Sequence, residues 1–393
     1  MNLELTRKEL LPRLKIVASA IEERRTPAIL GNILLQADRE VLKLTGSDGE
    51  IEVTCTLPIE DGSDFALAVP KKLLDITRSV ADGDKLLLTD KDGKLIVKSG
   101  KSRFTLATLP ADDYPATPEL SEPKQLTLPQ AQLKSLIRQC AFCIAANDVR
   151  YYLTGLFLVA QESDVHLVAT DGHRMATVSL QLPKQSEPEP QPKKAKKKSK
   201  PPMLVVVDDY NKDDDIDAGI IIPRKAVFEL LKLLGEDGDV QISYTDTHIR
   251  FKITESLQLT SKLIDGRFPD WRSVIPSQAT NIITVSKALL YSTLSRVLLL
   301  SNEKYKGVRL TLSENLLTIN AKNPSQEEAT DELEIDYTGE PLEIGFNGTY
   351  LLDALTAVET DNVQLAFTDS NSSVLITQTE DRVGQWIIMP MRL

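Results

Sequence analysis

The sequence predicts an α+β protein made of three tandem repeats, each with two helices and antiparallel strands. A helix-start signal recurs at Pro70, Pro223 and Asn347, and each is followed 20 to 23 residues later by a Thr-Asp pair that ends a strand-like segment. Self-similarity at matching intervals marks a repeated structural unit. The expected domains are residues 1–124, 125–278 and 279–393.

One helix opens each repeat. Three segments carry apolar residues at helical spacing, roughly Thr6–Ser19, Leu128–Ala145 and Ser286–Leu300. The second helix of each repeat starts at the recurring signal, because proline suits the first helical position and asparagine suits the N-cap.

Strands fill the intervals between these helices. Hairpin-like runs lie between the two helices of a repeat, for example residues 31–36 with 41–45 and 156–159 with 165–170. After the second helix comes a strand that ends in Thr-Asp, and aspartate favours a turn at that point. These segments are residues 86–90, 241–246 and 364–369.

The middle repeat carries a charged insertion at residues 184–217. Three prolines precede a lysine-rich run at 193–200, and an acidic stretch follows at 208–215. Such a segment is most simply a surface loop. A nucleic-acid role for the lysines stays open, since the acidic half could equally neutralise them.

Composition narrows the class of protein. The 393 residues carry a net charge of −11, with 41% hydrophobic and 26% charged residues, which is typical of a globular protein. No apolar run reaches the ~18–20 residues of a membrane-spanning helix, and charged residues crowd the first twenty positions. With only three cysteines a disulfide scaffold is excluded. We therefore expect a cytoplasmic protein that does not bind membranes.

The usual signatures of catalysis and of metal binding are missing. Cys140 and Cys143 form one C-x-x-C inside a predicted helix, while Cys55 and the histidines are scattered singly, so packing cysteines are the better interpretation. No phosphate-binding, dinucleotide-binding, serine-hydrolase or zinc-protease motif occurs. The sequence thus predicts a protein that is not an enzyme and that needs no cofactor or metal.

Basic residues concentrate in the expected helices. The six helical windows hold 14 basic and four acidic residues, although the whole chain is acidic. Lysine is a good helix former, but solvated helix faces alone would favour mixed signs. If these helices share a surface, it would attract a phosphate backbone without reading base sequence.

Two other classes of function are alternatives for this sequence. A metal-dependent nuclease could use Asp90, Asp171, Asp246 and Asp369, but three of these recur at equivalent places of separate repeats, which favours a role in turns. A sequence-specific regulator is the third possibility, although no zinc finger, basic zipper or RNA-binding aromatic motif is present.

Five sequence strings make the chain resemble the bacterial DNA polymerase III β subunit, the sliding clamp family, over essentially its whole length. The resemblance implies three clamp domains that form half of a closed ring. It also implies a head-to-tail homodimer that encircles double-stranded DNA as a processivity factor of the replicative polymerase. The strings are Asp148–Leu153, Ala169–Arg174, Leu263–Asp270, Leu300–Lys304 and Met389–Leu393.

The resemblance implies three sets of site residues. The DNA-binding candidates are Arg24, Lys71, Arg78, Asn147, Tyr152, Arg224 and Lys225. In the dimer interface, Phe104 would meet Leu299 and Leu300, while opposite charges orient the two chains. The charged candidates there are Lys72, Arg103, Glu327, Glu328 and Asp331. For the two leucines, core packing is the alternative interpretation.

A groove between the second and third domains would bind short linear motifs of the replicative polymerase α subunit, the clamp-loader δ subunit and other clamp-motif proteins. Its set is mainly apolar with a few polar groups, as a peptide groove requires. The matching residues are Leu153, Thr170, Gly172, His173, Arg174, Met175, Pro269, Val274, Asn347, Tyr350, Ser373, Ile387, Met389, Pro390, Met391 and Arg392. Two features depart from the family pattern: Ser273 stands where an arginine is frequent, and the insertion has no counterpart.

Overall fold

A computed structural model describes residues 3–22, 27–60, 64–161, 164–182, 219–277, 279–379 and 384–392. The charged insertion and Arg24 lie outside the described residues. The chain divides into two compact units: unit 1 comprises Met1–Ser135 and Ile222–Asp265, and unit 2 comprises Leu136–Ile221 and Gly266–Leu393.

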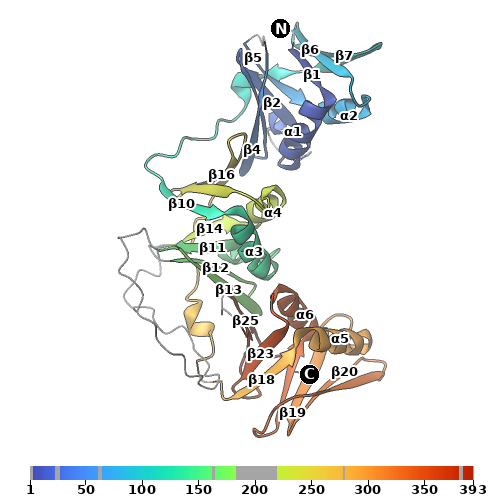
Figure 1. The fold of residues 1–393 in the computed structure, drawn as a ribbon, viewed down its shortest axis with the longest axis vertical. Helices are drawn as coiled ribbons and strands as arrows, with labels where there is room; N and C mark the ends of the chain where they lie inside the picture. The colour runs from blue at the N-terminus through green and yellow to red at the C-terminus, as the bar shows by residue number, and fades with distance from the viewer. Residues whose placement is uncertain are drawn as a thin grey trace, which may run out of the picture. The chain divides into compact units, whose positions relative to one another are not determined.

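The predicted α+β class is confirmed, with helices packed on sheets in both units (Figure 1). Within the described residues the α-helices are α1 (Arg7–Ser19), α2 (Lys72–Ser79), α3 (Gln130–Cys140), α4 (Arg224–Leu233), α5 (Lys287–Val297) and α6 (Gly348–Ala357).

Unit 1 contains two antiparallel sheets. The smaller has the order β1-β6-β7-β8, with β1 at Leu3–Thr6, β6 at Lys85–Lys91, β7 at Lys94–Ser99 and β8 at Ser102–Ala107. The larger has the order β10-β15-β16-β17-β4-β3-β2-β5-β9. Its strands are β10 (Lys124–Pro129), β15 (Asp239–Tyr244), β16 (His248–Thr254), β17 (Leu257–Lys262), β4 (Ile51–Pro58), β3 (Val41–Ser47), β2 (Asn32–Ala37), β5 (Phe65–Pro70) and β9 (Leu109–Pro110). The β17–β4 pairing joins the first and second predicted repeats.

Unit 2 also contains two sheets. One has the order β14-β11-β12-β13-β25-β24-β23-β18 and the other β21-β20-β19-β22. The first comprises β14 (Ile220–Pro223), β11 (Gly155–Ala160), β12 (Asp164–Thr170), β13 (Arg174–Gln181), β25 (Gly384–Ile388), β24 (Val374–Gln378), β23 (Asn362–Phe367) and β18 (Asn281–Ser286). The second comprises β21 (Glu328–Glu334), β20 (Leu316–Lys322), β19 (Gly307–Ser313) and β22 (Leu342–Asn347). The β13–β25 pairing brings the second and third predicted repeats together.

Helix α1 shows how the sequence forms these layers. Thr6 and Glu9 make a reciprocal capping box, which satisfies two backbone donors at the helix start. The helix buries Leu10, Leu14 and Val17. A Cβ at Gly46 on β3 would lie 2.0 Å from the carbonyl oxygen of Val17, so only glycine permits this close approach of helix and sheet.

Two predictions about turns and helices need correction. Thr89 and Asp90 lie within strand β6, and the chain reverses at Asp92 and Gly93, whose φ angles of 52° and 70° suit a tight hairpin. The Asp-Gly pair, two residues further on, was the true turn signal. The helix expected from Leu128 begins at Gln130 because Leu128 and Pro129 pair with β15.

The interpretation of the cysteines as packing residues is confirmed. Cys140 ends α3, Cys143 lies in the short 3-10 turn that follows, and both are buried. Burial raises the pKa of both thiols far above the usual range. The described residues hold no cluster of three or more side chains suited to a metal ion.

Candidate functional site

A pocket of about 210 Å³ opens in unit 2 beside the β13–β25 pair, and we call it the groove pocket. Its floor is apolar: Leu153, Met175 and Ile387 are each at most 3% exposed. The lining residues are Arg150, Tyr152, Leu153, Thr170, Gly172, Arg174, Met175, Pro269, Asp270, Trp271, Val274, Ile387 and Met389. An apolar floor with a few polar groups at the rim suits a short peptide or a small apolar ligand.

Strand register places the floor. Met175 on β13 pairs directly with Ile387 on β25, and Arg174 pairs with Ile388. Because successive side chains of a strand point to opposite faces, Met175 and Ile387 project from the same face of the sheet. The turn Tyr151–Leu153 and the turn Arg272–Val274 supply two walls.

The turn between β12 and β13 is held by its own side chains. Asp171 accepts hydrogen bonds from the backbone N–H groups of His173 (2.9 Å) and Arg174 (3.0 Å), and Thr170 Oγ1 accepts one from Gly172. Gly172 has a φ of +85°, and a Cβ there would lie 2.7 Å from the Arg150 guanidinium. The positive φ therefore favours glycine here, and a Cβ would also have to displace the end of the Arg150 side chain.

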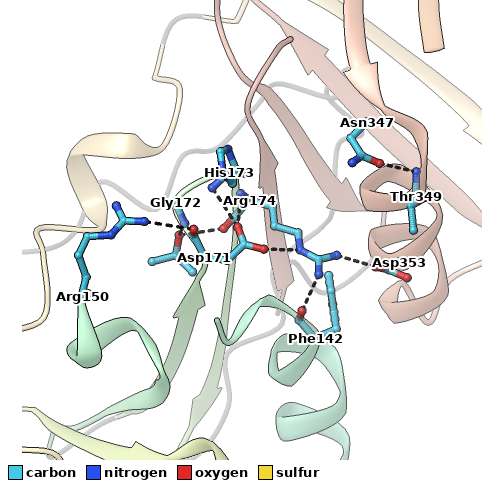
Figure 2. A network of polar contacts seen from close by, with 10 residues as sticks. Phe142, Arg150, Asp171, Gly172, His173, Arg174, Asn347, Thr349 and Asp353 are labelled. Atoms are coloured by element: carbon cyan, nitrogen blue, oxygen red, sulfur yellow. Dashed lines mark hydrogen bonds and ion pairs between the residues drawn. The ribbon is translucent and has the colours of Figure 1, made fainter. Parts of the chain in front are cut away.

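Arg174 is the centre of the polar network (Figure 2). Its guanidinium donates to Asp171 (2.9 Å), Asp353 (2.5 Å) and the carbonyl of Phe142 (2.8 Å), and it lies 4.3 Å from the centroid of the Tyr350 ring. Burial alone would lower its pKa, but Cys143 and the two carboxylates outweigh burial and raise the pKa of Arg174. The side chain is 13% exposed, so it stays charged in a fixed position at the rim.

Arg150 extends the rim towards solvent. It makes two hydrogen bonds to the Asp148 carboxylate, at 3.0 and 2.8 Å, and these bonds hold the pKa of Asp148 at about 2. Figure 2 shows Arg150 reaching across to the turn that contains Gly172, where it donates to the Asp171 carbonyl.

Residues Met389–Arg392 form a segment that we call the tail. Its two backbone hydrogen bonds run from Met389 N to His173 O (2.9 Å) and from Met391 N to Gly345 O (2.8 Å). These bonds hold Met389 at the groove pocket, while Met391 and Arg392 line a second pocket.

The structure brings most of the predicted groove residues together. Nine line the groove pocket: Leu153, Thr170, Gly172, Arg174, Met175, Pro269, Val274, Ile387 and Met389. His173 lies beside the tail, Tyr350 packs on Arg174, and Asn347 caps α6 by accepting from Thr349 N. Ser373 and Pro390 are half-buried and do not line it.

Three lining residues were missed: Arg150, Asp270 and Trp271. Arg150 and Asp270 lie inside two of the five family strings, and Trp271 follows the second of these directly, so proximity to a motif was the available signal. Tyr152, predicted to bind DNA, lines this pocket as well. Ser273 is exposed, and its hydroxyl donates to the Asp270 carbonyl.

The predicted DNA-binding residues differ in their surroundings. Arg78 and Asn147 are exposed, and Arg78 pairs with Asp75. Lys71 is half-buried, and the Arg224 guanidinium lies 4.5 Å from the centroid of the Phe228 ring.

Lys225 on α4 is held by carboxylates rather than projecting freely. It pairs with Glu22 (2.5 Å) and with Asp48, whose side chain is fully buried. Burial would lower the pKa of Lys225, but its hydrogen bonds to Asp48 and Glu22 raise it.

Four of the eight predicted dimer residues lie on two sheet edges. Arg103 and Phe104 belong to β8 and Glu328 and Asp331 to β21; each strand ends its sheet. Leu299 is 80% exposed, which excludes the alternative that it packs in the core, whereas Leu300 is half-buried. Lys72 and Glu327 are exposed, and Asp331 pairs with Arg296.

Fold and pocket together match one class of protein: the chain belongs to the DNA polymerase III β subunit family. The model of the N-terminal domain matches residues 1–118, that of the central domain residues 127–194 and 206–270, and that of the C-terminal domain residues 272–392. Members of this family are non-catalytic processivity factors, so the chain is not an enzyme.

Particular relatives support the same assignment over the full length. The beta sliding clamps of Pseudomonas aeruginosa and of Escherichia coli K12 are each 38% identical to the chain, with all of both chains covered. Among solved structures, a DnaN sliding clamp from Pseudomonas aeruginosa bound to griselimycin has a TM-score of 0.88 at 38% identity. One from Bartonella birtlesii bound to griselimycin has 0.87 at 33%; both are covered completely.

No helix among the described residues is long and apolar enough to cross a membrane.

Proposed function

We propose that the chain is a DNA sliding clamp that tethers the replicative polymerase to its template. Three clamp domains, at residues 1–124, 125–278 and 279–393, form half of a ring, and two chains close it head to tail. The observation that carries the proposal is the groove pocket, beside which two backbone hydrogen bonds hold the tail. The match of all three domains to the clamp family supports it. We propose that the protein acts in the cytoplasm, where the bacterial chromosome is replicated.

The proposed hold on DNA is topological, so contacts with the backbone need only be weak and mobile. Arg24, Lys71, Arg78, Asn147, Tyr152, Arg224 and Lys225 are the proposed contacts. Lys225 is the weakest of them because two carboxylates already engage it. We expect retention on nicked circular plasmid and loss after linearisation. Equal retention on both forms would reject a ring.

Ring closure would join the edge strand β8 of one chain to the edge strand β21 of another. Arg103 on β8 and the acidic exposed side chains of β21 have opposite charges, so like edges repel and unlike edges attract. Replacing Leu299 and Leu300 by alanine should give folded monomers, measured as solution mass at micromolar concentration. A dimer of unchanged mass would place the interface elsewhere.

The groove pocket would take linear motifs from the polymerase α subunit, the clamp-loader δ subunit and other clamp-motif proteins. Griselimycin, which two relatives bind, is the direct probe. Trp271 lines the pocket and Trp386 is buried in the sheet, with its indole N–H bonded to the Gln139 carbonyl. We expect griselimycin to change the fluorescence of the wild type strongly and that of Trp271→Phe weakly. Failure of the wild type to bind would overturn the groove assignment.

A further inference from the structure

A second pocket, of about 610 Å³, lies in unit 2 on the solvent-facing side of the β21-β20-β19-β22 sheet. Arg309 on β19 pairs with Asn320 on β20 and with Gly345 on β22, and all three positions lie on the outward face, which alternates with the buried one. Gly307 and Gly345 add no side chains to this face. The pocket lies over this face, and the tail is bonded to the edge strand β22 through Met391 N and Gly345 O.

The lining of this pocket is cationic. Arg309, Lys322 and Arg392 contribute three positive charges, and no carboxylate is among the residues that line it. The nearest acidic groups lie on neighbouring strands: Glu343 pairs with Arg309 at 3.2 Å, and Glu328 accepts a hydrogen bond from Asn320. Lys322 is exposed and lies directly opposite Glu328 in the β20–β21 pairing, but it makes no ion pair with the described residues.

An aromatic side chain closes one side of the pocket. Tyr305 is 55% exposed, and the loop that carries it is fixed because the Asn302 side chain accepts hydrogen bonds from Lys304 N and Tyr305 N. An exposed aromatic ring beside three cations is suited to an extended peptide with carboxylate side chains.

The tail runs from the groove pocket to this pocket. Met389 lines one, Met391 and Arg392 line the other, and two backbone hydrogen bonds fix the segment between them. A peptide seated on the apolar floor has only to follow the tail to reach the cations. We infer that the second pocket binds acidic residues that flank the apolar docking motif of a partner protein. This inference rests on the proposed groove function.

The test uses fluorescein-labelled peptides and the full chain. One peptide has only an apolar core of leucine and phenylalanine, and two more carry four Asp/Glu residues at the N-terminal or the C-terminal end. Matched peptides carry Asn/Gln instead. We expect the acidic extension at one of the two ends to raise the affinity of the peptide for the protein three- to tenfold at low salt. The matched Asn/Gln extension should not raise it.

The variant pair is Arg309→Gln with Lys322→Gln. It should abolish the gain from the acidic extension and leave the affinity for the core peptide unchanged, whereas Lys94→Gln in unit 1 should change neither. A gain that survives the double substitution would overturn the inference. A double variant that instead loses retention on circular DNA would assign the pocket to phosphate and also overturn it.

Failure of the proposed groove is distinguishable from failure of this pocket. If the core peptide does not bind, the groove function fails. Whether or not the core peptide binds, lysine acetylation footprinting with the acidic peptides tests the second pocket directly. Protection of Lys322 supports the inference, and unchanged reactivity of Lys322 at saturating peptide overturns it.

Discussion

Two cation clusters, around Arg174 in unit 2 and around the partly exposed Lys225 in unit 1, are built alike and differ in their surroundings. Each cation meets two carboxylates from other elements: Asp171 and Asp353 for Arg174, and Glu22 and Asp48 for Lys225. Arg174 lines an apolar pocket, whereas Lys225 lines none of the pockets described above. The same interaction can therefore shape a binding site or only tie elements together.

The largest expected effect comes from Arg174→Ala. Removal of the guanidinium leaves Asp171 and Asp353 without their shared partner, and we expect a loss of about 3 kcal/mol in the free energy of unfolding. Griselimycin affinity should fall at least tenfold. Urea unfolding and fluorescence titration measure the two effects, and Arg174→Lys, which keeps the charge without the directed bonds, should lie between. Unchanged affinity would show that the network is structural only.

Lys225→Met should affect stability alone. Asp48 is fully buried but also accepts backbone hydrogen bonds from Glu50 and Ile51, so we expect a loss of about 2 kcal/mol in the free energy of unfolding and no change in griselimycin affinity. The salt dependence of DNA association should also stay the same. If the slope of log K for DNA association against log salt concentration fell by about one, Lys225 would be a phosphate contact.

Gly172→Ala tests how tightly the turn must fit. Because of the positive φ and the close Arg150 guanidinium, we expect this substitution to lower the free energy of unfolding by about 1 kcal/mol. It should also weaken griselimycin binding several-fold. Gly31→Ala is the matched control, because its added Cβ meets no atom within 4 Å. If both variants bind equally well, the turn adapts and the proposed rigidity is wrong.

The smallest effect concerns Asp148. Its pKa lies near 2 in the folded protein against an ordinary value of 3.8, so its pairing with Arg150 is complete above pH 3.8 and is lost as the pH falls towards 2. We expect griselimycin affinity to be flat from pH 8 to pH 5. Asp148→Asn should lower the griselimycin affinity slightly, and by the same factor at every pH in that range. A change in the wild-type affinity near pH 6 would show that another group controls binding.

Short-range patterns predicted the helices well. Asn347 caps α6 as expected. Proline was expected at the first helical position, but Pro223 is the N-cap of α4 and Pro70 ends β5 two residues before α2. The turn at Asp92 was misplaced because two adjacent pairs, Thr-Asp and Asp-Gly, competed, and strand register decided between them.

The groove residues came from the family resemblance, and nine of them line one pocket in the structure; their role in binding stays a prediction. What sequence reasoning could not supply was pairing over long separations. Only the β13–β25 register places Met175 beside Ile387, and only the fold shows that Lys225 meets Asp48.

The buried thiols have a practical consequence. All three cysteines of the chain are buried. Burial raises the pKa of Cys55 to about 11 and that of Cys140 higher still, and it raises the pKa of Cys143 well above its ordinary value. At neutral pH a maleimide dye would find almost no native thiolate. A cysteine engineered on β8 or β21 would therefore be the sole labelled position, and energy transfer between two such dyes could follow subunit exchange in real time.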